Sequence, residues 1–273
     1  MVDVQTGEAQ LAEGGLAFIL PSYGGYVYSR AAAASFFANT PESLKPVLLH
    51  YDDSSPRYHH QNWEKFYCGL PGGRIWHHHF SRNGGLTRSW NTGLDLARKL
   101  GCRYAIAGNS DVLFPPGWEA GFRRHLDAGE CHLMGPVTNA PGRTGGDGHR
   151  QDVKNYLADY VLDDSATAIA AVSSRLQQEY ADKPAVLGDV NGFFMIAKVD
   201  TWWRGAFDSH HVFDPKYPMA GNEDELQIRW NQLGFKMGVS LSSFIFHYRS
   251  VTRGEKYRTR GACRMRRDSC NLR

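Results

Sequence analysis

The segment that decides the fold is RYAIAGNSD, residues 103–111, in which a short apolar run ends in a polar turn. Residues 104–107 have the length and the apolar character of a buried strand. Asp111 stands where that strand runs out, and PPGWEAGFRRHL (115–126) resembles the start of a helix. Open α/β sheets bind ligands beyond the carboxyl ends of their strands, so Asp111 is a candidate ligand-binding residue. A polar surface turn is the alternative interpretation.

Apolar runs and helix-like segments alternate around this point. Three earlier runs predict buried strands: LAFILPS (16–22), KPVLLHYDDSSP (45–56) and GRIWHHHFS (73–81). Three segments between them predict helices: SRAAAASFFAN (29–39), NWEKFYCGL (62–70) and the amphipathic TRSWNTGLDLARKLG (87–101). The alternation indicates an α/β fold, a Rossmann-like and mainly parallel sheet with helices on both faces.

The second half of the chain is less regular. A strand is expected from residue 132, a polar helix over 152–181, a strand entering a helix over 189–203, and a final strand over 235–250. NEDELQIRWNQLG (222–234) predicts a helix with Leu226, Trp230 and Leu233 on its buried face. Because no Pro- or Ser-rich linker interrupts the chain, we expect a single domain with two halves.

Composition indicates an ordinary globular protein with a basic tail. Of 273 residues 42% are hydrophobic and 22% charged, and the formal net charge is +3. Residues 251–273 hold eight Lys/Arg against two acids, so this tail carries +6 and can contact an anionic surface or nucleic acid; a solvated end is the alternative. Neither a signal peptide nor an apolar span is recognisable, and the five cysteines form no CxxC pair. We therefore expect a cytoplasmic protein with reduced thiols, which can lie against a membrane surface.

Several catalytic signatures are missing from the sequence. It contains no GxGxxG, P-loop, HExxH or GxSxG, which argues against dinucleotide binding, NTP hydrolysis, zincin chemistry and the α/β-hydrolases. The histidine runs at 59–60, 77–79 and 210–211 invite a metal interpretation. Adjacent residues on a strand point to opposite faces, so such a run does not converge on one ion and structural roles are expected.

Acidic residues and one histidine remain at the predicted element ends: Asp52, Asp53, Asp111, Glu223, Asp224 and His247. A carboxylate and an imidazole, completed by phosphate oxygens and water, suit Mn²⁺ or Mg²⁺. Structural alternatives exist for both late groups. Asn222 with Glu225 resembles a helix capping box, and His247 alone resembles a core histidine.

These residues sit in segments that together resemble the GT-A fold nucleotide-sugar glycosyltransferases, most closely family 2. The segments that carry the resemblance, between Leu16 and Thr252, are FILPSYGG (18–25), YDDSSP (51–56), NGGLTRSWNTGLDLA (83–97), GNSD (108–111) in place of a DxD motif, VNGFFMIAK (190–198), FDPKYPMAGNEDELQIRWNQLGFK (213–236) and SSFIFHYRSVT (242–252). The resemblance implies a domain over 16–252, with a nucleotide-sugar half (16–115) and an acceptor half (116–252), between a flexible start (1–15) and the basic tail (253–273).

The resemblance also implies an activity and a site. The activity is inverting transfer of a sugar from a nucleoside-diphosphate sugar, UDP-sugar first, to an acceptor hydroxyl, with Mn²⁺ or Mg²⁺ as cofactor. Asp111 and His247 are the implied metal ligands, and Asn191 and Gly192 lie on the acceptor side. The implied donor-binding residues are Pro21, Ser22, Tyr23, Asp53, Asn83, Arg88, Asn91, Asn109 and Ser110.

Two points of the site depart from the family pattern. Asn109 occupies the first position of the DxD motif, so Asp111 is its one charged ligand. The base is ambiguous in register, because the direct ED match favours Asp224 whereas counting back from Arg229 favours Glu223. We take Asp224 first. A non-catalytic sugar-nucleotide or glycan-binding module on the same fold is the alternative function. The Gly-rich segment 139–150 is interpreted as a lid over bound donor or as a plain loop.

Overall fold

The fold was analysed in a computed structural model, which describes residues 12–55, 60–70, 74–141 and 150–249. Ordered structure begins before residue 16, because Ala12 is buried and Gly14 N–H donates to the Gly101 carbonyl. The predictions for residues 1–11, for most of the Gly-rich segment, for His59 and for the basic tail fall outside the described residues. No helix within the described ranges has the length and apolar character needed to cross a bilayer.

The core is the predicted mainly parallel sheet. Its eight strands among the described residues are ordered β3-β2-β1-β4-β8-β6-β9-β7, and only β8 and β7 pair antiparallel to their neighbours. A separate two-stranded ribbon pairs β5 with β10. The strands are β1 (Leu16–Ser22), β2 (Pro46–Asp52), β3 (Ile75–His79), β4 (Tyr104–Gly108), β5 (Val112–Leu113), β6 (Leu133–Val137), β7 (Val186–Leu187), β8 (Phe194–Lys198), β9 (Met237–Phe244) and β10 (Phe246–His247).

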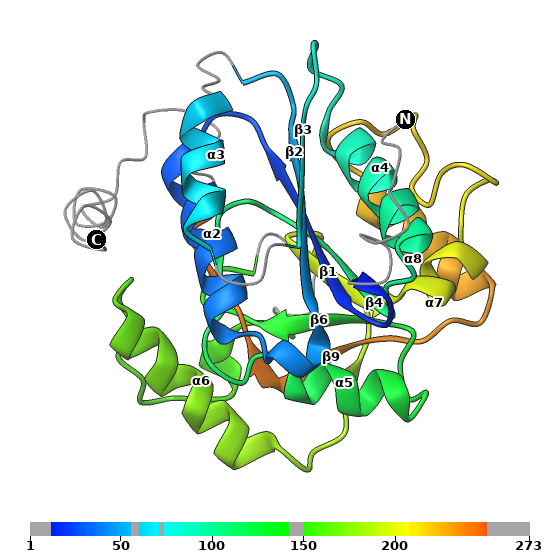
Figure 1. Ribbon diagram of the computed structural model, residues 1–273. Coiled ribbons are helices and arrows are strands. Elements are labelled where there is room, and N and C mark those ends of the chain that lie inside the picture. The colour runs from blue at the N-terminus through cyan, green and yellow to red at the C-terminus, as the bar shows by residue number, and fades with distance from the viewer. Residues whose placement is uncertain (1–11, 56–59, 71–73, 142–149, 250–273) are drawn as a thin grey trace.

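Helices cover both faces of this sheet, as Figure 1 shows. Along β1 the side chains of Ala17 and Ile19 join one apolar cluster, whereas Phe18 and Leu20 join the other, as the twofold period of a strand requires. The first cluster includes residues of α4, α6, α7 and α8, and the second those of α2 and α5. The helices are α2 (Tyr26–Asn39), α3 (His60–Cys68), α4 (Leu86–Lys99), α5 (Ala120–Asp127), α6 (Ala166–Tyr180), α7 (Val199–Arg204) and α8 (Asn222–Gln232), with 3₁₀ turns at Glu42–Leu44 and Val153–Asn155.

The predicted helix over 152–181 is wrong in its first half, where α6 begins only at Ala166. Short polar side chains bond to nearby backbone instead: Asp152 accepts from Lys154 N–H, and Asp163 accepts from Ser165 N–H. Such local bonds compete with the helical hydrogen bonds. Ser165 then caps α6 by accepting from Ala168 N–H at 3.2 Å.

The expectations for the ends of α8 also need correction. Asn222 is not the N-cap; Gly221 occupies that position with a left-handed backbone, and Glu225 pairs with Arg229 rather than closing a capping box. Leu233 lies beyond the helix end and is 55% exposed, so it is not part of the buried face.

The start of α8 is held by the side chain of Asn222, which makes a tertiary contact. Asn222 is fully buried, and its Nδ2 donates to Thr87 Oγ1 at 2.8 Å. Thr87 Oγ1 in turn donates to the Tyr217 carbonyl. The other atom of the same amide, Asn222 Oδ1, accepts from the Glu223 N–H at 2.9 Å. One side chain thus bonds to its own helix and also joins α4 and α8 at their N-terminal ends.

The histidine run of β3 points to alternate faces, as predicted. His77 Nδ1 lies 2.7 Å from Nδ1 of His50, whereas His78 packs against Phe80 on the other side. His50 is fully buried, and its Nε2 lies 2.7 Å from Ser22 Oγ. Burial first, and the neighbouring His77 second, hold the pKa of His50 well below its ordinary value. His50 is therefore neutral in the folded protein.

We expect His50 to make folding stability depend on pH. Above about pH 6.5 both folded and unfolded states carry a neutral His50; below it the unfolded chain binds the proton, so the free energy of unfolding falls with falling pH. His50→Gln should flatten this fall in denaturant titrations between pH 7 and 5. His210→Gln, at an exposed site, is the control. A variant that keeps the wild-type slope contradicts the expectation.

Thr87→Val should destabilise the protein by about 1–3 kcal/mol, because it leaves the buried Asn222 amide and the Tyr217 carbonyl without a partner. Thr92→Val on the same helix is the matched control: its hydroxyl donates only to the Arg88 carbonyl of its own helix. We expect that variant to stay within about 0.5 kcal/mol of wild type. Equal losses in urea unfolding would show that the joint between α4 and α8 adds nothing.

Candidate functional site

The carboxyl ends of β1, β2 and β4 lie together at one edge of the sheet. Ser22 pairs in register with Asp52, and Ile19 with Ala107, so these strands end side by side. The loops that follow these ends carry five of the predicted site residues: Tyr23, Asp53, Asn109, Ser110 and Asp111. These loops therefore lie at the same edge of the sheet.

The ribbon of β5 and β10 brings Asp111 and His247 together from distant parts of the chain. His247 pairs with Val112, the residue after Asp111, and Tyr248 N–H donates to the Asp111 carbonyl at 2.9 Å. His247 Nε2 lies 3.3 Å from Asp111 Oδ1, and both residues are about 95% buried. The predicted pair of metal ligands thus lies within contact distance.

The orientation of the His247 ring is fixed by its neighbours. Its Nδ1 lies 2.9 Å from the Ala140 carbonyl oxygen, which can only accept, so Nδ1 carries the hydrogen and donates. The ring stacks on Phe193 with centroids 4.5 Å apart and planes 10° from parallel. Nε2 has no hydrogen-bond partner. In the neutral ring it presents a lone pair to the Asp111 carboxylate.

Two electron-rich atoms that face each other in a buried place favour a cation between or beside them. A second proton on the imidazole would meet this need, and so would a metal ion. Among the residues that the structure describes, no three His, Cys, Asp or Glu side chains gather as a metal site. Two protein ligands nevertheless fit Mn²⁺ or Mg²⁺ when substrate phosphates complete the shell. Asp111 and His247 would hold such an ion.

Glu223 and Asp224 differ sharply in surroundings. A side chain on Gly192 would come within 2.8 Å of the Glu223 carboxyl carbon, so this carboxylate lies against the backbone of Gly192. Burial, with a smaller effect of the Asp224 charge, raises the pKa of Glu223 above its ordinary value. Asp224 is exposed.

The turn at residues 190–193 links these two parts of the site. Phe193 stacks on the ring of His247, the predicted metal ligand, and the neighbouring Gly192 contacts Glu223. Two buried glutamines hold the turn: Gln227 bonds to both the N–H and the carbonyl of Val190, and Gln151 accepts from Asn191 N–H at 2.6 Å. Gly192, one of the two predicted acceptor-side residues, thus lies beside Glu223.

The predicted donor-side residue Asp53 already has several partners. Its carboxylate accepts from the N–H groups of Gly84 and Gly85, at 3.0 and 2.8 Å, and pairs with the Arg88 guanidinium. Asn83 Nδ2 donates to the Asp53 carbonyl. These bonds fix the loop before α4, so Asp53 and Arg88 form one rigid unit.

The loops after β1 and β2 are joined by Asp52. It accepts from Ser22 Oγ at 3.2 Å and from Ser55 N–H at 2.9 Å, while Ser55 Oγ accepts from Gly24 N–H. Tyr23, which stands between Ser22 and Gly24 in the chain, has 48% of its surface exposed. Of the remaining predicted residues, Pro21 and Ser110 are buried, and Asn109 N–H donates to the Phe193 carbonyl.

Asn91 does not face this edge. Its side chain accepts from the N–H groups of Val212 and Phe213 and donates to the Phe213 carbonyl. The polar atoms of this side chain thus tether the 208–218 segment to α4, and its role in donor binding stays a prediction.

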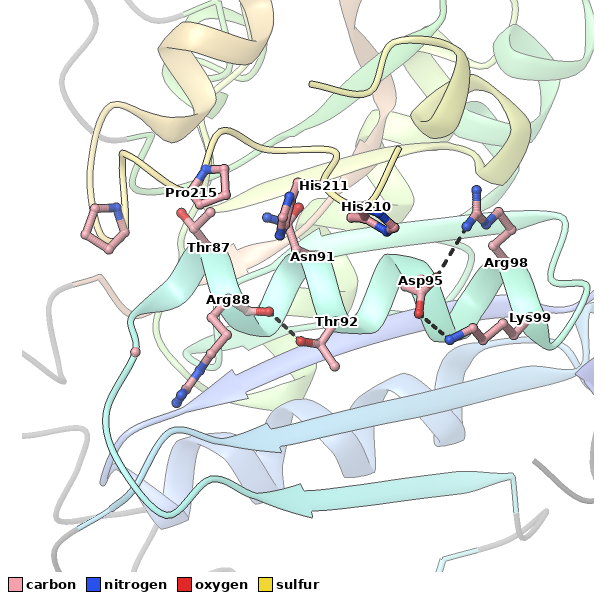
Figure 2. A pocket seen from close by; sticks show the side chains of 12 residues that line it. Thr87, Arg88, Asn91, Thr92, Asp95, Arg98, Lys99, His210, His211 and Pro215 are labelled. Carbon is pink, nitrogen blue, oxygen red and sulfur yellow. Dashed lines mark hydrogen bonds and ion pairs between the residues drawn. The ribbon is translucent and has the colours of Figure 1, made fainter. Parts of the chain in front are cut away.

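A hollow of about 650 Å³ lies along the outer side of α4, against the segment that carries His210, His211 and Pro215 (Figure 2). Its charged side chains are already paired: Asp95 with Arg98 and Lys99, and His211 with Asp208. Neither Asp111 nor His247 lines it. The buried Asp111–His247 pair is therefore the better candidate for the reaction centre.

Sequence reasoning missed the groups that position the site: Phe193, Ala140, Thr87, Gln151 and Gln227. Phe193 acts through ring stacking, and the other four act through hydrogen bonds that involve backbone atoms. Such contacts leave no recognisable pattern of residue types in the sequence. Only Gln227 gave a signal, as a polar residue beside the buried Leu226 on α8.

Comparison with known proteins supports the fold and little beyond it. Neither a family profile nor a curated protein matches the chain. The structure of GalNAc-T7 with UDP, GalNAc and Mn²⁺ matches with a TM-score of 0.60 at 16% identity, over 85% of this chain and 43% of that one. S. aureus TarS matches with a TM-score of 0.54 at 15% identity, over 85% of this chain and 60% of that one. This chain spans less than two thirds of either protein, and the likeness shows that it has the GT-A glycosyltransferase fold.

Proposed function

We propose that this protein is an inverting glycosyltransferase, which moves a sugar from a nucleoside-diphosphate sugar to an acceptor hydroxyl with the help of Mn²⁺ or Mg²⁺. The observation that carries the proposal is the turn at 190–193. Its consecutive residues Gly192 and Phe193 contact the half-buried acid Glu223 and the ring of His247. Nε2 of that ring lies beside the buried carboxylate of Asp111. Transfer needs a cation site for the leaving diphosphate and a base for the acceptor. UDP-sugar is the first donor to test, because GalNAc-T7 was solved with UDP.

On this proposal the donor lies across the carboxyl edge. Tyr23 offers an exposed ring on which a nucleobase can stack, next to the loop that Asp53 and Arg88 hold rigid. Asp111 and His247 hold the divalent ion, which would neutralise charge on the leaving diphosphate. The stacked Phe193 keeps water from one face of the imidazole.

Glu223 is the base that the geometry supports. Inversion requires an acceptor hydroxyl on the side of the sugar away from the diphosphate, with a carboxylate in hydrogen-bond reach of its proton. Glu223 is held toward the site by Gly192, and its raised pKa makes it a better proton acceptor than an ordinary carboxylate. Asp224, preferred from the sequence, is exposed. We therefore assign the base to Glu223. Asp224 is then a neighbouring charge that raises the pKa of Glu223.

Asp111→Asn and His247→Gln should each abolish the Mn²⁺-dependent part of UDP binding, because each removes one of two protein ligands. Calorimetric titration of UDP with and without Mn²⁺ measures this. The surface pair Asp208 and His211, with Nδ1 and Oδ2 3.0 Å apart, gives matched controls, and Asp208→Asn and His211→Gln should bind as wild type. Unchanged Mn²⁺ dependence in the Asp111 and His247 variants would refute the metal site.

Glu223→Gln should lower turnover by about 10²–10⁴-fold while UDP binding is kept. The base must be deprotonated, so the rate falls as pH drops through the raised pKa of Glu223. Asp224→Asn removes a neighbouring negative charge, lowers that pKa and should shift the acid limb of the profile to lower pH. If Asp224→Asn loses the activity and Glu223→Gln keeps it, the base is Asp224.

The test of the function itself is hydrolysis of the donor, in which water takes the place of the acceptor. Purified protein with Mn²⁺ is offered UDP-, GDP-, CMP- and dTDP-sugars, and thermal shift identifies the nucleotides that bind, since a ligand of the folded state alone raises its stability. Release of the free nucleotide, lost in Glu223→Gln, supports the transferase. Binding of a sugar nucleotide without release of free nucleotide in every case would support the non-catalytic module. Asn109 in the DxD position is the sequence feature that favours this alternative.

A further inference from the structure

Asn139, in the segment after β6, contacts His247 from outside the site described above. Its Oδ1 accepts from the His247 N–H at 2.8 Å, and its Nδ2 donates to the His247 carbonyl at 3.1 Å. One side chain thus satisfies both backbone groups of a residue more than a hundred positions away. The next residue, Ala140, accepts from the ring of the same histidine.

These bonds take the place of sheet pairing that stops just before them. Ile245 N–H donates to the Val137 carbonyl, where the β6–β9 pairing ends. Thr138 turns instead to Asp152 in an isolated bridge. Without the Asn139 side chain, the N–H and the carbonyl of His247 would lose the hydrogen bonds that they form with this segment. A hydrophobic or charged side chain at position 139 could not donate and accept in the same way.

Together the contacts leave the imidazole little freedom. Asn139 fixes the backbone of His247, Ala140 fixes the tautomer, and Phe193 fixes the plane of the ring. Only Nε2 remains without a hydrogen bond, and it faces Asp111. Outer groups that orient a ligating histidine contribute strongly to metal affinity.

We infer that Asn139 is a positioning residue for the divalent-metal ligand His247, so that metal affinity depends on a side chain that never touches the ion. The inference rests on the proposed function, because it takes His247 to be a metal ligand. It predicts that Asn139 acts only through His247.

The experiment is a double-mutant cycle read by Mn²⁺ affinity rather than by activity. Wild type, Asn139→Ala, His247→Ala and the double variant are loaded with UDP and titrated with Mn²⁺, with free Mn²⁺ followed by electron paramagnetic resonance. Asn139→Ala should weaken Mn²⁺ binding by about 10-fold or more and leave metal-free UDP binding unchanged. In the His247→Ala background the same change should add no further loss.

The matched control is Asn39→Ala. Asn39 is also half-buried, and its Nδ2 also donates to a backbone carbonyl, that of Phe114. This variant should keep wild-type Mn²⁺ affinity. Asn139→Ser, whose short side chain cannot reach both backbone groups, should follow Asn139→Ala and serves if the alanine variant does not fold.

The outcomes separate the inference from the proposed function. Wild-type Mn²⁺ affinity in the Asn139 variants, beside a clear loss in His247→Ala, overturns the inference alone. Losses that add in the double variant, or a loss of the same size in Asn39→Ala, also overturn it, because a general structural effect would then explain them. If His247→Ala binds Mn²⁺ as tightly as wild type, the metal site of the proposed function fails and the inference falls with it.

Discussion

The turn at residues 190–193 is the constraint on which the rest of the site depends. It enters β8, the strand that runs against its neighbours β4 and β6, so the turn reaches the same edge as the carboxyl ends of the parallel strands. Gln151 and Gln227 satisfy its buried backbone groups, which would otherwise be costly away from water. The Asn109 N–H bond to Phe193 ties it to the loop after β4. His247 and Glu223, to which the reaction is assigned, both contact this turn.

Buried charge divides the site into parts that are already satisfied and a part that is not. The Asp53 carboxylate has two N–H donors and an arginine, so its burial is compensated within the protein. Asp111 and His247 are as deeply buried, yet Nε2 of the histidine has no hydrogen-bond partner. Such a group in a native fold calls for an explanation, and the divalent ion proposed above would supply one. Asp53 therefore holds the loop before α4 in place, apart from any contact with the nucleobase of the donor.

The regular elements followed from local patterns, and the errors have local causes too. Strands β1, β2 and β4 are buried along their whole length and are mainly apolar, as burial on both faces of a parallel sheet favours. The helix prediction is wrong over 152–165 because Asp152 and Asp163 bond to nearby backbone N–H groups. Helical periodicity does not reveal such local hydrogen bonds. At α8 the predicted cap was wrong, since Gly221 is the N-cap and Asn222 donates to Thr87 in another helix.

The sequence by itself determined the layered sheet, the edge at which the site lies, and Asp111, His247 and the acid pair as candidates. Those inferences depend on periodicity and on chemistry that individual residues carry. Only the tertiary structure distinguished the two acids, because Glu223 lies against Gly192 whereas the neighbouring Asp224 is exposed. It also decided the orientation of His247, through Asn139, Ala140 and Phe193, which lie far from it along the chain. Hydrogen bonds to backbone atoms and ring stacking depend on distance in space, and no local pattern of side chains encodes them.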